Sequence, residues 1–123
     1  MADTPTPSAI AGVMTLANVM ATLWERAADH LTNDELKWLT DAGERAAYLL
    51  ANAADVAEGI GALVGADTPG SSRAGSFTGG GDTATLLFFL ADTMEDARML
   101  SEIGANAEYR LQRSQVGRST SAQ

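Results

Sequence analysis

Apolar residues recur at helical spacing over three stretches of the chain. Between residues 7 and 31, apolar or small residues return every three or four positions, as on one face of an α-helix. Further apolar residues leave only a narrow polar stripe, so we expect this helix to be buried on more than one side and to be the central one. Thr6 is its expected N-cap and Pro7 its first residue, because the first turn does not use the N–H that proline lacks.

A stricter pattern follows in residues 33–64 and 83–113, where apolar or small residues alternate in steps of three and four. This heptad spacing is typical of helices in bundles and coiled coils. Thr32 and Glu35 have the spacing of a capping box, and Asp82 with Thr83 is the expected cap of the last helix. The two predicted seams are Leu36, Leu39, Gly43, Ala46, Leu50, Ala53, Ala57, Ile60 and Val64, and Leu86, Leu90, Thr93, Ala97, Leu100, Gly104, Ala107 and Leu111.

Residues 65–82 separate the two heptad stretches and contain six glycines and one proline. This composition does not sustain a helix or a strand, so we expect a long loop. Residues 1–6 and 114–123 have no core to join, and we expect a disordered N-terminus and a flexible tail. The sequence therefore predicts one all-α domain over residues 7–113, an antiparallel bundle of three long helices (about 7–31, 33–64 and 83–113) with one long Gly-rich loop.

The charge of the chain is strongly acidic and unevenly distributed. The formal net charge is −8, all 16 acidic residues precede residue 110, and residues 110–123 carry three arginines and no acid. An acidic body repels phosphates, so we expect no direct binding of nucleic acid. The same charge attracts a basic protein surface, mainly by speeding the encounter.

Two further features bear on the compartment. Residues 4–24 carry no charge, but Pro, Thr, Ser and Asn interrupt them, so we predict a soluble chain without a membrane helix. No Lys or Arg precedes Arg26, which is unlike a signal peptide, and there is no cysteine, which excludes disulfides and thiolate sites. A cytoplasmic protein is the expectation.

Candidate catalytic groups are few. His30 is the only histidine, and metal sites and His-assisted catalysis need neighbours that helical geometry does not supply here, so we interpret it as a helix C-terminal histidine. The close carboxylate pairs fall on predicted solvent-facing stripes. Gly79 to Thr83 resembles a phosphate-binding loop only loosely, because it lacks the Gly-Lys-Ser/Thr ending and follows no strand. We therefore predict no enzyme activity, no metal and no cofactor.

The run Leu86-Leu87-Phe88-Phe89-Leu90 is the clearest candidate for binding. Five consecutive large apolar residues cover every face of a helix, and one bundle interface does not bury them all. They close the end of the bundle with Phe77 as a plug, or they form a patch for self-association or a partner. The residues assigned to this apolar patch are Phe77, Leu86, Leu87, Phe88, Phe89, Met94, Met99 and Ile103, and those assigned to an acidic face are Asp92, Glu95, Asp96 and Glu102.

These observations favour a non-catalytic protein–protein interaction module, with a homodimer as the expected state, that acts by occupying a partner's surface. One specific version is an acidic inhibitor of a basic protein that handles nucleic acid. Phages and mobile elements make such small acidic inhibitors, anti-CRISPR proteins among them, and the analogy rests on size and charge alone. The alternative is a structural or chaperone-like helical subunit of a larger assembly.

Overall fold

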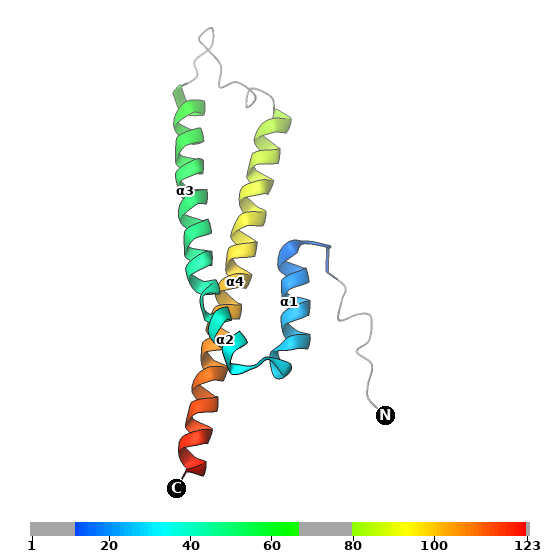
Figure 1. Ribbon diagram of the computed structural model, residues 1–123. Helices are drawn as coiled ribbons and strands as arrows, with labels where there is room; N and C mark the ends of the chain where they lie inside the picture. Colours follow the sequence, from blue (N-terminus) through cyan, green and yellow to red (C-terminus); the bar gives the residue numbers. More distant parts are fainter. Residues whose placement is uncertain (1–11, 67–79, 123) are drawn as a thin grey trace.

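The computed structural model describes residues 12–66 and 80–122, and every regular element in these two ranges is helical. The prediction of an all-α helical bundle is confirmed. The elements are α1 (Leu16–Ala27), a short 3-10 helix η2 (Ala28–His30), α2 (Asn33–Thr40), α3 (Ala42–Ala66) and α4 (Gly80–Ser121) (Figure 1).

The first helix begins later than its sequence pattern indicates. Thr15 is the N-cap: its backbone is extended, and its hydroxyl accepts a hydrogen bond from the Asn18 N–H at 3.1 Å. The Asn18 side-chain amide also donates to the Val13 carbonyl at 2.8 Å. These local bonds fix a turn ahead of Leu16. The prediction that residues 12–15 are helical is therefore wrong. The cap predicted at Thr6 lies outside the described residues.

The predicted capping box at Thr32 is confirmed. The Glu35 N–H donates to the Thr32 hydroxyl at 3.2 Å, and the Thr32 N–H donates to the Glu35 carboxylate at 2.7 Å. The helix that follows is interrupted at Asp41, which separates α2 from α3. Just before this residue the Thr40 hydroxyl donates to the Lys37 carbonyl at 2.6 Å, a local bond that competes with regular helical pairing.

The fourth helix is the central one. It contacts α3, α2 and α1, whereas α1 packs mainly on α4, so the prediction that the first helix is central is wrong. In Figure 1, α3 and α4 form a long antiparallel hairpin, and α1 lies on the other side of α4, beside its middle and lower part. The short α2 lies at the foot of α3 (Figure 1).

The last helix is longer than predicted at both ends, and α3 extends two residues past its predicted end at Val64 although it begins only at Ala42. The last helix extends past the predicted end at Arg113 to Ser121, so residues 114–121 are helical rather than an irregular tail. At the loop, α3 includes Gly65 and Ala66 and α4 begins at Gly80, ahead of the predicted cap at Asp82. The remainder of the predicted Gly-rich loop, with Phe77, lies outside the described residues.

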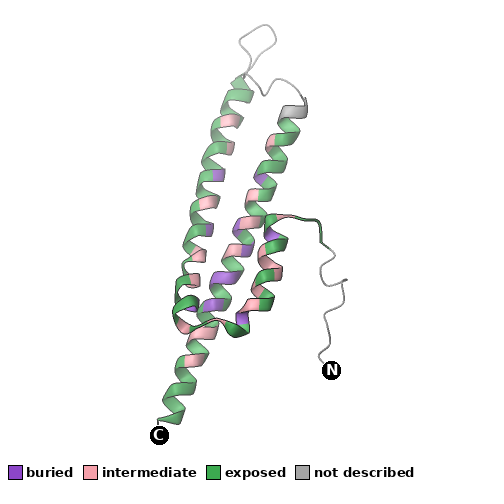
Figure 2. Cartoon of the chain, turned by 45° about the vertical axis from the view of Figure 1, so that its right-hand side comes forward, coloured by how far each residue is buried: buried purple, intermediate pink, exposed green. Residues whose placement is uncertain are grey.

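The core is small and rich in alanine. Ten apolar residues are buried among the described residues, and six of them are alanines: Ala17, Ala28, Leu36, Ala46, Ala53, Leu90, Ala97, Met99, Ile103 and Ala107. Leu36, Ala46 and Ala53 belong to the first predicted seam, and Leu90, Ala97 and Ala107 belong to the second, so both seams are confirmed at these positions. Figure 2 shows the buried residues along the facing sides of the helices. Because alanine buries little area, this core supplies limited hydrophobic stabilisation.

An ion pair joins the end of η2 to α4. Arg110 donates to the Asp29 carboxylate at 2.7 Å and lies over the Trp24 ring at 6.0 Å from its centroid. The hydrogen bond from Arg110, and then its charge, lower the pKa of Asp29. A lowered folded-state pKa means that the pair stabilises the fold above the ordinary pKa of 3.8 and loses this contribution as the pH falls below it.

We expect the Asp29→Asn variant to unfold at a slightly lower temperature than the wild type at pH 7, and we expect this difference to shrink as the pH falls toward 3. The effect is small because both side chains are partly in solvent. Thermal unfolding followed by circular dichroism at both pH values checks this. A difference that persists unchanged at pH 3 would contradict the role given to the carboxylate charge.

One described stretch, Asn33–Ala66, has the length and apolar composition of a candidate membrane span. Only 6% of its most apolar window is buried within the chain. Core helices of soluble proteins also meet these criteria, and here the stretch is divided by the turn at Asp41.

Candidate interaction surface

Large apolar side chains are mostly on the outside of this molecule. Four residues larger than alanine are buried among the described ones, whereas 17 large hydrophobic side chains are exposed. The exposed set is Val13, Met14, Leu16, Val19, Leu23, Trp38, Tyr48, Leu50, Val56, Leu63, Val64, Leu87, Phe88, Phe89, Met94, Tyr109 and Val116. Single exposed hydrophobics are ordinary, but an excess of this size leaves much apolar surface that the described part of the chain does not cover.

The predicted apolar run divides between core and surface. Leu90 is buried and Leu86 is half-buried, whereas Leu87, Phe88 and Phe89 are 60%, 71% and 63% exposed. Successive residues point about 100° apart around a helix, so these three side chains face three different directions. Of the five residues in the run, only Leu86 and Leu90 are covered by the described part of the bundle. The proposed plug, Phe77, lies outside the described residues.

Two members of the predicted apolar patch belong to the core instead. Met99 and Ile103 are each 7% exposed and form a cluster with Ala17, against which Trp24 and Leu39 pack. They are therefore not available on the surface of this chain, and their assignment to a surface patch is wrong. The sequence places them outside the seam that faces α3, and it is α1 and α2 that cover them. Met94 is 50% exposed and remains a candidate.

Three of the four predicted acidic residues meet at the start of α1. Asp92, Glu95 and Asp96 line a hollow of about 430 Å³ together with Met14 to Asn18. The first turn of α1 contains no acidic residue of its own, so carboxylates from α4 lie near the positive end of its dipole. The hollow therefore combines negative charge with the exposed apolar side chains of Met14 and Leu16.

The fourth acidic residue, Glu102, forms an ion pair with Arg98 and does not line this hollow. Arg98 donates to the Glu95 carboxylate at 3.0 Å and also pairs with Glu102. The hydrogen bond and charge of Glu95, and then the charge of Glu102, raise the pKa of Arg98. The acidic face is thus partly neutralised within the chain, and Asp92 and Asp96 are the carboxylates of the hollow that Arg98 does not pair with.

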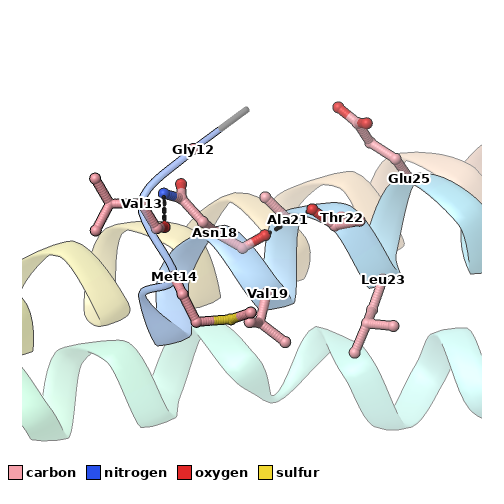
Figure 3. Close-up of a pocket in the computed structure, with 9 residues that line it drawn as sticks. All are labelled: Gly12, Val13, Met14, Asn18, Val19, Ala21, Thr22, Leu23 and Glu25. Atoms are coloured by element: carbon pink, nitrogen blue, oxygen red, sulfur yellow. Dashed lines mark hydrogen bonds between the residues drawn. The ribbon is translucent and has the colours of Figure 1, made fainter. Parts of the chain in front are cut away.

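A second hollow, of about 360 Å³, lies along α1 itself. Figure 3 shows Met14, Val19 and Leu23 pointing to one side of α1 and Asn18, Thr22 and Glu25 pointing to the other. This hollow was not predicted from the sequence, because the residues before Leu16 were expected to be helical. Its only sequence signal is the apolar character of α1 outside the face that packs on α4.

The candidate catalytic groups remain dispersed. His30 is exposed at the end of η2. In residues 12–66 and 80–122, no group of three or more His, Cys, Asp or Glu side chains is arranged to hold a metal ion. Gly80 and Gly81 belong to the segment that loosely resembles a phosphate-binding loop, and they lie in the first turn of α4.

Comparison with protein-family models, with curated proteins and with solved structures gives no match for this chain.

Proposed function

We propose that this chain is a non-catalytic protein–protein interaction module that binds a basic protein surface through the first half of α4 and the first turn of α1. Phe88 and Phe89, the two largest exposed side chains there, lie one to two turns before Asp92 and Asp96 on the same helix. This juxtaposition of exposed aromatic rings and carboxylates is the observation that carries the proposal. Residues three or four apart on a helix are neighbours.

The chemistry of this surface suits arginine and lysine side chains. Carboxylates accept charge-assisted hydrogen bonds from a guanidinium, and an aromatic face attracts a cation. Aromatic side chains that become fully desolvated are common binding hot spots. One partner of this kind is a protein whose basic surface ordinarily binds nucleic acid. By occupying that surface, this chain would inhibit the partner. This is the acidic-inhibitor version of the proposal.

A structural subunit of a helical assembly is the second candidate. The exposed side chains along the length of α4, notably Tyr109 and Val116 near its C-terminal end, favour it. In that case the partner would be another helix rather than a basic surface, and binding would depend little on salt.

Affinity capture from the native host with mass spectrometry, followed by binding of the purified partner, tests the proposal. We expect Phe88→Ser with Phe89→Ser to weaken binding at least tenfold. Asp92→Lys with Asp96→Lys should weaken it similarly, and wild-type binding should fall with rising salt.

Matched controls are available at comparable exposure elsewhere. Leu63→Ser on α3 removes an exposed apolar side chain, and Glu58→Lys reverses an exposed charge on the same helix. Both should bind as the wild type does. Equal capture by all variants, or no partner captured by the wild type, would contradict the proposal.

A further inference from the structure

A second apolar seam runs along α4, distinct from the one that packs on α3. Leu87, Met94, Tyr109 and Val116 are 60%, 50%, 59% and 67% exposed. At 100° per residue, these four positions fall within an arc of about 60° of the helix. The α3-facing seam of Leu90, Ala97 and Ala107 lies beside them on the same helix but is buried. We call this stripe, which is apolar towards both ends and contains Arg98 and Ala105 between Met94 and Tyr109, the outer stripe.

The outer stripe has a symmetry that a second copy would match. Leu87 and Val116 lie equally far from the point between Ser101 and Glu102, and so do Met94 and Tyr109. If two α4 helices lie antiparallel with a twofold axis at that point, Leu87 is level with Val116 of the second copy. Met94 is then level with Tyr109 of the second copy. A twofold contact of this kind is closed, because each copy contributes the same residues.

The surface between these apolar positions is recessed. A hollow of about 490 Å³ lies between α3 and α4, lined by Leu50 of α3 and by Met94, Ala97, Arg98, Ser101, Glu102 and Ala105 of α4. The small side chains of Ala97 and Ala105 leave room in this hollow for an aromatic ring. In the antiparallel pair, Tyr109 of the second copy is level with Met94, at the edge of the hollow. A second hollow of about 470 Å³ includes Tyr109 and Val116. Each copy therefore offers large side chains at the positions where the other is hollowed.

Charge at the centre of the outer stripe suits the antiparallel arrangement. At 100° per residue, Arg98 lies within the arc of the outer stripe and Glu102 lies beside it, whereas Asp92 and Asp96 are on the opposite side of α4. With the twofold axis between Ser101 and Glu102, Arg98 comes within about one helical turn of Glu102 of the second copy. A parallel pair in register would instead set Arg98 beside Arg98 and Glu102 beside Glu102.

The contact is long enough for a specific dimer. From Leu87 to Val116 the helix extends about 44 Å, and helices are about 10–12 Å wide, so the covered strip is on the order of 500 Å² per copy. The total of about 1,000 Å² reaches the lower bound for specific interfaces.

From these observations we propose that two copies of this chain associate through antiparallel outer stripes of α4, pairing Leu87 with Val116 and Met94 with Tyr109. This inference goes beyond the proposed function, because it names a second binding surface and a second partner. The surface for a basic partner, at Phe88 and Phe89, lies on other sides of the same helix and stays exposed in the dimer.

Light scattering during size-exclusion chromatography tests the dimer. The wild type should have twice the chain mass of 12.8 kDa at micromolar concentration. Leu87→Glu with Val116→Glu should raise the dimer dissociation constant on the order of 100-fold, because twofold symmetry repeats each substitution. Leu23→Glu, at a side chain that is 61% exposed on α1, is the matched control and should stay dimeric. A monomeric wild type, or an unchanged dimer of the doubly substituted variant, overturns the proposal.

Cross-linking tests the register without disturbing the fold. The chain has no cysteine, so Leu87→Cys and Val116→Cys variants each carry a single thiol. With a short bis-maleimide linker, we expect a covalent dimer only when the two variants are mixed. Cross-linking of either variant with itself would show a parallel pairing and contradict the proposal. A monomeric chain that still captures a basic partner would overturn this inference alone, whereas a dimer that captures none would overturn only the basic-partner function.

Discussion

Replacing Ile103 with alanine should lower the free energy of unfolding by about 2–4 kcal/mol. Ile103 is 7% exposed and lies in the cluster where Ala17 of α1 and Leu39 of α2 meet α4. The substitution removes buried methyl groups and leaves a cavity in the cluster that joins three helices. Among the residues that the structure describes, only four larger than alanine are buried, so this is one of the largest losses that a single change can cause.

Urea unfolding followed by circular dichroism measures this effect. The control is Leu23→Ala, which removes an apolar side chain that is 61% exposed on α1. It should change the free energy of unfolding by no more than about 0.5 kcal/mol. Similar losses for the two variants would show that the cluster around Ile103 is not the core of the fold.

Replacing Gly104 with alanine should also destabilise the chain, by about 1–2 kcal/mol. A Cβ atom at this position would lie 2.8 Å from the Gly43 nitrogen and 3.3 Å from the Thr40 carbonyl oxygen. Both neighbours are backbone atoms at the junction of α2 and α3, so the helices must move apart. This clash outweighs the gain of about 0.5–1 kcal/mol that alanine normally gives inside a helix.

The other side of the same contact supplies the control. A Cβ atom at Gly43 would meet nothing within 4 Å outside its own helix, and the same holds for Gly117 near the end of α4. Gly43→Ala and Gly117→Ala should therefore be neutral or stabilising by up to about 1 kcal/mol. Thermal unfolding of the three variants side by side checks this. Stabilisation by Gly104→Ala would contradict the close approach of α4 to the α2–α3 junction.

The helical periodicity was enough to predict the class of fold and most positions of the two seams of the hairpin, although Leu50 and Val64 of the first seam are each 44% exposed. Leu36 and Leu90 are buried where the heptad spacing places them, because seam residues of neighbouring helices must face one another. The start of α1 was not predictable from periodicity. Thr6 and Thr15 are both suitable caps, and the bond from Asn18 to the Val13 carbonyl, which periodicity does not reveal, favours the later one.

The candidate surface was predicted only in part, because a helical pattern shows which residues share a face but not which faces are covered. Phe88, Phe89 and Met94 are exposed as a binding surface requires. Met99 and Ile103 share their apolar character but lie farther along α4, where α1 packs against it. Glu102 was assigned to the acidic face because of its predicted helical stripe. In the structure it pairs with Arg98 and does not line the hollow at the start of α1.

We propose that the large exposed side chains of this protein are covered by another protein chain, a second copy first of all. The most direct test is the thermal unfolding midpoint of the full chain between about 1 and 100 µM, because association that favours the folded state raises the midpoint with concentration. We predict a clear rise for the wild type and none for Leu87→Glu with Val116→Glu. A midpoint that stays constant for the wild type over this range would contradict the account.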